Sequence, residues 1–219
     1  MTTLPTDPIT SLDADFAPMA LQVGESMLAV PGLSIREKMF TWITSDVCDG
    51  NLGLPFETHL KVLTTAGGAS WQTVREVLRH LAPYAGYPAV VRAFVRLAEI
   101  EAAHPEVKGV DLPAPEAWEP PAYPEGADAG LAAFATDQAG RRWGRPYLTP
   151  RERALICVAA DVVQQTLGTP FRTHVEAARR AGVEGEELRW LLRMMAELSV
   201  GRSIEAMERL DAYLKGGTS

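Results

Sequence analysis

The chain is poor in cysteine, has no excess of positive charge and contains no long apolar run. Its 219 residues include two cysteines, too few for a disulfide framework, which favours a reducing cytoplasm. Lysine and arginine number 21 against 28 acidic residues, the formal net charge is −7, and no basic stripe is present. Residues 1–15 contain no basic residue and no long apolar run, so we expect no signal peptide there, and no stretch of about 18 residues is apolar enough to span a membrane. We therefore expect no nucleic-acid or membrane partner.

Motifs that mark bound cofactors or metals are also missing. The sequence contains no phosphate-binding loop, dinucleotide fingerprint, Gly-x-Ser-x-Gly or Cys-x-x-Cys. Its four histidines lack carboxylate or cysteine partners at metal-site spacing. We expect neither a metal nor a cofactor. The histidines are His59, His80, His104 and His174.

What the sequence does contain is an internal repeat. Residues 33–37 (LSIRE) return 115 positions later as LTPRE, and residues 52–59 (LGLPFETH) return at the same offset as LGTPFRTH. Such self-similarity is typical of a tandem duplication. The predicted organisation is a first repeat at 12–104, a Pro-rich connector at 105–125, and a second, more degenerate repeat at 126–215.

Helix signals occur in both repeats, and no alternating strand pattern is visible, so the predicted class is all-α. Ser34 and Glu37 form a capping box, and Thr149 and Glu152 form its equivalent. In the connector, we expect the aromatic residues to pack it on the surface. Expected helices cover 16–28, 55–66, 89–102, 128–143 and 186–198, and others begin after Ser34, Ser70 and Thr149 or end at Gly182.

His59 and His174 occupy equivalent places in the two repeats, as do Glu37 and Glu152. An imidazole oriented by a carboxylate can move a proton near neutral pH. The alternative is that the glutamates only cap helices and the histidines only fill polar notches. Retention in both copies favours the acid/base interpretation for His59.

A second polar pair occurs in the first repeat alone. His80 and Tyr84 lie four positions apart on one helix face, and their equivalents 114 positions later are Met194 and Leu198. Either this is an ordinary helix end, or the first repeat keeps a proton-handling pocket that the second has lost. We expect a single active pocket per chain.

These residues resemble the carboxymuconolactone decarboxylase family, within the alkyl hydroperoxidase D-like superfamily. The first repeat carries the resemblance best: residues 33–37 resemble the family's helix start, 59–67 its His-x6-Ala-Gly segment, and 80–89 (HLAPYAGYPA) its most specific signature. In the second repeat, residues 140–148 (GRRWGRPYL) resemble the Gly-x-x-Trp-x-Arg-Pro-Gly-Leu segment of the decarboxylases.

The resemblance implies an all-helical protein that forms a homo-oligomer, a trimer or a related assembly. The peroxidase branch of the superfamily uses Cys-x-x-Cys before the histidine, but the corresponding positions here are Leu52 and Pro55, and Leu167 and Pro170. The chain is therefore not expected to be a peroxidase. The resemblance points instead to the lyases that need no cofactor.

The leading hypothesis is decarboxylation of a small carboxylated lactone or unsaturated acid. His59 would protonate carbon with Glu37 orienting it, and His80 or Tyr84 would stabilise the enolate. The alternatives are a cofactor-independent cyclase, isomerase or dehydratase of a larger metabolite, or a non-catalytic helical scaffold. Residues expected around the substrate, with an arginine holding its carboxylate, are Arg36, Arg145, Trp143, His174 and Glu152.

Overall fold

The computed structural model describes residues 7–116, 118–124 and 128–216. Over these residues the protein is all-α, as predicted: it is 72% helical, with eleven α-helices and no strand. None of the described helices is long and apolar enough to cross a membrane.

The first half of the chain forms six helices in order. The bounds are α1 Asp7–Leu12, α2 Phe16–Leu28, α3 Ile35–Asp49, α4 Leu54–Thr65, α5 Trp71–Ala85 and α6 Tyr87–Ala103. The helix α1 was not predicted, and α6 begins at Tyr87 because Gly86, with φ of 90°, ends α5 and opens α6 at once.

The second half adds five more helices and a short 3-10 segment. The bounds are α7 Ala129–Trp143, α8 Pro150–Gln164, α9 Thr169–Arg180, α10 Gly185–Met194, η1 Met195–Glu197 and α11 Val200–Leu214. The last predicted stretch, 186–198, is therefore helical only in part, because the chain tightens into a 3-10 turn after Met194.

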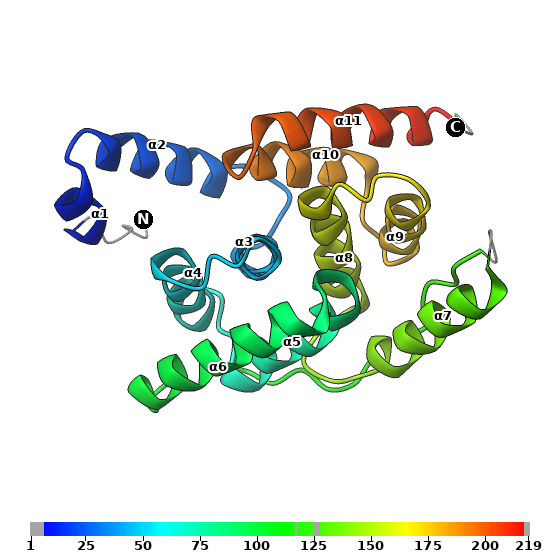
Figure 1. Ribbon diagram of the computed structural model, residues 1–219, viewed down its shortest axis with the longest axis horizontal. Helices are drawn as coiled ribbons and strands as arrows, with labels where there is room; N and C mark the ends of the chain where they lie inside the picture. The colour runs from blue at the N-terminus through cyan, green and yellow to red at the C-terminus, as the bar shows by residue number, and fades with distance from the viewer. Residues whose placement is uncertain (1–6, 117, 125–127, 217–219) are drawn as a thin grey trace.

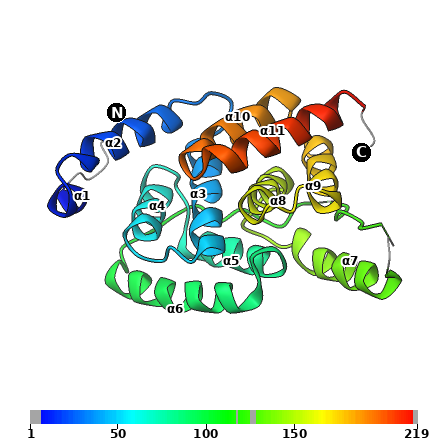
Figure 2. The same cartoon turned by 45° about the horizontal axis from the view of Figure 1, so that its top comes forward.

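Two equivalent helices, α3 and α8, form the centre of the molecule. Both capping boxes predicted at their starts are present. In Figures 1 and 2, α3 and α8 lie between α10 and α11 on one side and α5 and α6 on the other. They pack on each other, with α4 beside α3 and α9 beside α8. Most of their residues are buried, and the buried apolar ones belong to one continuous hydrophobic core.

In each half the first long helix packs on the other half, and two reciprocal ion pairs join the halves. The helix α2 packs on α10 and η1, and α7 packs on α5. Arg36 donates to Glu152 at 2.6 Å, and Arg151 donates to Glu37 at 2.6 Å. Each N-terminal helix thus covers part of the other half.

The connector runs over the surface in extended form and is fastened to both halves. The Val110 amide donates to the Gly68 carbonyl at 3.0 Å, and Trp118 stacks on Trp143 with ring centroids 5.3 Å apart. The prediction that its aromatic residues pack it on the surface is confirmed. Residue 125, and residues 126–127 at the expected start of the second repeat, lie outside the described residues.

Candidate functional site

The strongest acid/base unit is a histidine–aspartate pair between α4 and α3. His59 Nδ1 lies 2.6 Å from Asp46 Oδ2. An ionised carboxylate only accepts, so Nδ1 donates and Nε2 is the acceptor of the neutral ring. Among the described residues nothing bonds Nε2, and the His59 side chain is 18% exposed. One side of the pair is therefore buried and the other is open.

The open side of His59 faces a cavity of about 510 Å³. The imidazole stacks on Trp42, with ring centroids 5.1 Å apart and an interplanar angle of 18°. This contact holds the ring plane while Asp46 fixes its rotation. The other residues of the wall come mainly from α2, α3 and α4, with Glu197 from η1, and include Phe16, Met39, Leu54, Val62, Glu197 and Leu198.

Two carboxyl groups of this pocket have raised pKa values. Burial raises the pKa of Asp46, although the hydrogen bond from His59 opposes this change. Burial also raises the pKa of Glu197, which lines the same pocket. The pocket therefore offers an oriented imidazole and a carboxyl group that holds its proton more readily than usual.

The second half contains an equivalent histidine–aspartate pair, but its histidine has no open ring nitrogen. His174 Nδ1 lies 2.6 Å from Asp161 Oδ2, but the hydroxyl of Tyr123 donates to His174 Nε2, also at 2.6 Å. The His174 side chain is only 1% exposed. Both nitrogens are thus occupied, and the connector supplies the residue that closes the pair.

A smaller cavity of about 270 Å³ borders this closed pair. Tyr84 meets His174 edge to face, with centroids 5.1 Å apart, and Tyr123 lies on another side. Burial raises the pKa of both phenols. They remain neutral and act as hydrogen-bond donors or packing groups.

The orienting partner of His59 is not the one predicted. Glu37 accepts hydrogen bonds from the Ser34 amide at 2.7 Å and from Arg151 at 2.6 Å, so its carboxylate is fully engaged at the start of α3. Asp46 takes the orienting position because it lies on α3 where that helix passes α4. The assignment of this role to Glu37 is corrected accordingly.

His80 and Tyr84 do not share a pocket with His59. His80 is fully buried, and its Nε2 donates to the carbonyl oxygen of Arg153 at 3.1 Å. Burial, together with the Arg153 charge, holds its pKa well below the usual value. Tyr84 points to His174 instead, because α5 packs against α8 of the other half. The predicted catalytic group is therefore divided between two places.

Four of the five residues expected around the substrate lie outside both histidine cavities and bond other residues of the protein. Arg36 pairs with Glu152 at 2.6 Å, and Arg145 pairs with the buried Glu76 at 3.0 Å. Trp143 is buried and donates to the Tyr84 hydroxyl at 3.3 Å. None of these four lines either histidine cavity. His174 does line its cavity, as expected of a residue in a pocket wall.

Sequence reasoning missed Asp46 and Asp161, although a signal was present. Asp-Val recurs at the 115-residue offset, 13 positions before each histidine. Both aspartates were visible as repeated residues but were not linked to the histidines, since that link depends on how α3 crosses α4. Over the described residues, no group of three or more His, Cys, Asp or Glu side chains is arranged to hold a metal ion.

Comparison with known proteins finds a likeness in the second half of the chain. Residues 129–211 match the model of the carboxymuconolactone decarboxylase family. The matched segment covers 83 of the 219 residues, so the comparison shows a likeness to this family within the second half of the chain. The match confirms the resemblance, but it falls on the second repeat, whereas we expected the first to carry it best. It spans α7 to most of α11, and therefore includes the Asp161–His174 pair. No curated protein matches the chain.

Proposed function

We propose that the chain is a cofactor-independent acid/base enzyme whose reaction centre is the His59 pocket. The observation that carries this proposal is the Asp46–His59 pair, with Nδ1 held at 2.6 Å and the opposite ring nitrogen open to a cavity. Asp46 stabilises the imidazolium, so His59 can take a proton from a substrate and return it at another atom.

In the decarboxylase version, a small carboxylated lactone or unsaturated acid loses CO2. The carbon–carbon bond to the carboxylate breaks and its electron pair moves into the conjugated carbonyl. His59, in its imidazolium form, then gives its Nε2 proton to carbon, and the ring regains a proton from water. The imidazolium is also the nearest cation for the developing enolate. The family match supports a carboxy-lyase, since it is for such a reaction that the family is named.

A second candidate is an isomerase, cyclase or dehydratase that acts on a larger neutral metabolite. The observation that favours it is the charge of the pocket wall, which includes Asp46, Asp49 and Glu197 but no lysine or arginine among its described residues. Arg202 lies 3.2 Å from Asp49 and neutralises that carboxylate only. Such a wall disfavours a substrate carboxylate and suits an uncharged ligand.

The proposal is tested by incubating the protein with 4-carboxymuconolactone and following CO2 release together with the loss of substrate absorbance. Release that disappears in His59→Gln and persists in His174→Gln supports the carboxy-lyase. If neutral lactones are isomerised and the carboxylated one is untouched, the second candidate replaces it. Turnover that is unchanged in His59→Gln contradicts both candidates, whereas a folded protein that turns over none of these substrates favours the non-catalytic scaffold.

We further propose that the chain arose by tandem duplication and acts in the cytoplasm as a homo-oligomer. Duplication is supported by the repeated sequence, by the matching capping boxes of α3 and α8, and by the equal histidine–aspartate distances. Mass measurement in solution tests the assembly, and a monomer at micromolar concentration would contradict it.

A further inference from the structure

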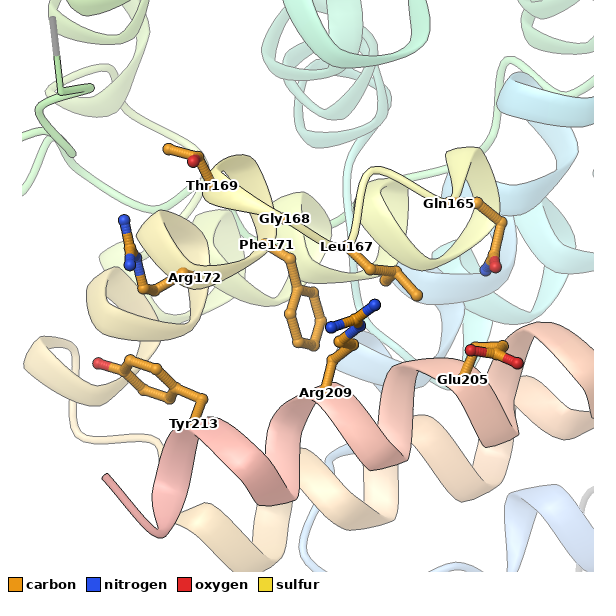
Figure 3. A pocket seen from close by; sticks show the side chains of 9 residues that line it. All are labelled: Gln165, Leu167, Gly168, Thr169, Phe171, Arg172, Glu205, Arg209 and Tyr213. Atoms are coloured by element: carbon orange, nitrogen blue, oxygen red, sulfur yellow. The ribbon is translucent and has the colours of Figure 1, made fainter. Parts of the chain in front are cut away.

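A groove between α9 and α11 holds two arginines and is separate from both histidine cavities. Figure 3 shows Arg209 reaching from α11 beside Leu167 and Phe171, with Arg172 on α9 at the other side of the groove. Its volume is about 430 Å³, and it shares no residue with the His59 pocket. A ligand bound in this groove would therefore contact none of the residues that line the His59 pocket.

The two arginines lack counter-ions. The guanidinium group of neither Arg172 nor Arg209 forms an ion pair or hydrogen bond with any residue that the structure describes. Most other arginines of the chain have carboxylate or carbonyl partners, and Arg151, for example, contacts both Glu37 and Glu187. Two unpaired guanidinium groups at one groove indicate a place for an anion from outside.

In the first half of the chain, the arginine equivalent to Arg209 has carboxylate partners that neutralise its charge. Arg96 is the tenth residue after the N-cap of α6, as Arg209 is after the N-cap of α11. Arg96 pairs with Glu57 of α4 at 2.8 Å and with Glu99 at 2.7 Å. In the first half, then, the arginine on the last helix is matched by two internal carboxylates.

In the second half both carboxylates have been replaced. Counted from the same helix N-caps, Arg172 stands where Glu57 is expected, and Ala212 stands where Glu99 is expected. Arg209 thus corresponds to Arg96, but a second arginine and an alanine stand at the positions of its two carboxylate partners. Arg172, the counterpart of Glu57, lines the groove.

We propose that this groove binds a small organic carboxylate between Arg172 and Arg209. Guanidinium groups match a carboxylate in shape and charge, and Leu167 and Phe171 provide apolar surface for the body of the ligand. Glu205 lines the same groove and repels a second negative charge, so the ligand carries a single carboxylate. The site is independent of the reaction proposed for His59.

Calorimetric titration with sodium benzoate, and with neutral benzamide as the matched ligand, tests this site. We expect saturable benzoate binding with a Kd of about 1 mM or tighter, and no comparable binding of benzamide. Arg172→Glu restores the first-half arrangement by placing an internal carboxylate opposite Arg209, and should weaken benzoate binding at least about tenfold. Arg209→Gln should do the same through loss of the cation.

Arg180→Glu is the control, since Arg180 is exposed on the same helix and does not line the groove. It changes the net charge as Arg172→Glu does and should leave binding within about twofold. Benzoate binding that is absent, that benzamide equals, or that Arg180→Glu weakens as much as Arg172→Glu overturns the proposal. Binding of inorganic phosphate in place of benzoate also overturns it.

Discussion

The two histidine–aspartate pairs have the same geometry and different surroundings. Nδ1 lies 2.6 Å from the carboxylate in both, but the side chain of His59 is 18% exposed and that of His174 is 1% exposed. The difference teaches that the pair itself is part of how each half folds, because both halves keep it. We propose that the access left to Nε2 is what separates a reactive pair from a structural one.

Neighbouring residues explain why access differs. In the first half Trp42 stacks on the imidazole and leaves its edge open, whereas the equivalent position on α8 is Cys157, which is buried. In the second half the connector brings Tyr123 onto His174 Nε2. No such hydroxyl covers His59 among the described residues, and the carboxyl group of Glu197 lines its pocket.

The largest expected effect compares two buried cations at equivalent positions, Arg153 and Lys38. Each donates to carbonyl groups at or just after the end of the preceding helix, but Arg153 also pairs with Glu76 at 3.2 Å, where both side chains are fully buried. Arg153→Met should lower the free energy of unfolding by about 3–5 kcal/mol, since Glu76 loses a buried partner. Lys38→Met should cost about 1–3 kcal/mol.

Urea unfolding measures both effects. Equal losses in the two variants would mean that Glu76 depends on Arg145 and Arg79 rather than on Arg153, and would remove this difference between the halves.

The next effect compares Asp46 with Asp161. Asp46→Asn removes the carboxylate that orients His59 and stabilises its cation, and should lower kcat about 100-fold, which is about 2.7 kcal/mol. Asp161→Asn should leave kcat within about threefold, because its histidine is closed by Tyr123. The kcat of each variant is measured across pH with the substrate that wild type turns over. A larger loss in Asp161→Asn would reverse the assignment of the active pocket.

A smaller effect concerns the pH dependence contributed by His80, whose counterpart is Met194. Its folded pKa lies well below the ordinary 6.5, so the unfolded state takes up a proton that the folded state refuses. Stability should therefore fall as pH drops below about 6.5, by up to about 1.4 kcal/mol per pH unit from this group. His80→Met should remove that part of the slope.

Urea unfolding between pH 7.5 and 5 compares His80→Met with wild type. Parallel curves for the two proteins would show that His80 ionises freely in the fold, against the burial seen here.

The smallest effect tests how the second pair is closed. Tyr123→Phe removes the hydroxyl that donates to His174 Nε2 and should cost about 1 kcal/mol of stability. The ring still covers the site, so no second activity should appear. Thermal unfolding and turnover assays measure the two quantities, and a gain of turnover that depends on His174 would show a latent second active site.

Local signals in the sequence predicted much of the fold. Ser34 and Thr149 begin their helices with the expected capping boxes, since the hydrogen bonds of such a cap lie within four residues. The all-α class and the packing of the connector were also predictable. The exchange of α2 and α7 between halves was not, because nothing local specifies which surface an amphipathic helix covers.

The candidate site could be predicted only in part for the same reason. His59 was identified from its repetition, but its partner Asp46 lies on another helix, and the sequence offered Glu37 as an equally repeated choice. His80 and Tyr84 were placed with His59 because they belong to the same repeat. In the fold α5 turns them towards α8, so Tyr84 meets His174.

Diethyl pyrocarbonate modification, mapped by mass spectrometry, tests the difference between the two pairs most directly, since the reagent acylates accessible imidazole nitrogens. Exposed His104 serves as the positive control and fully buried His80 as the negative control. The account predicts that His59 reacts readily, below or near the rate of His104, while His174 stays unmodified alongside His80. Modification of His174 at the rate of His59, or an inert His59, would contradict it.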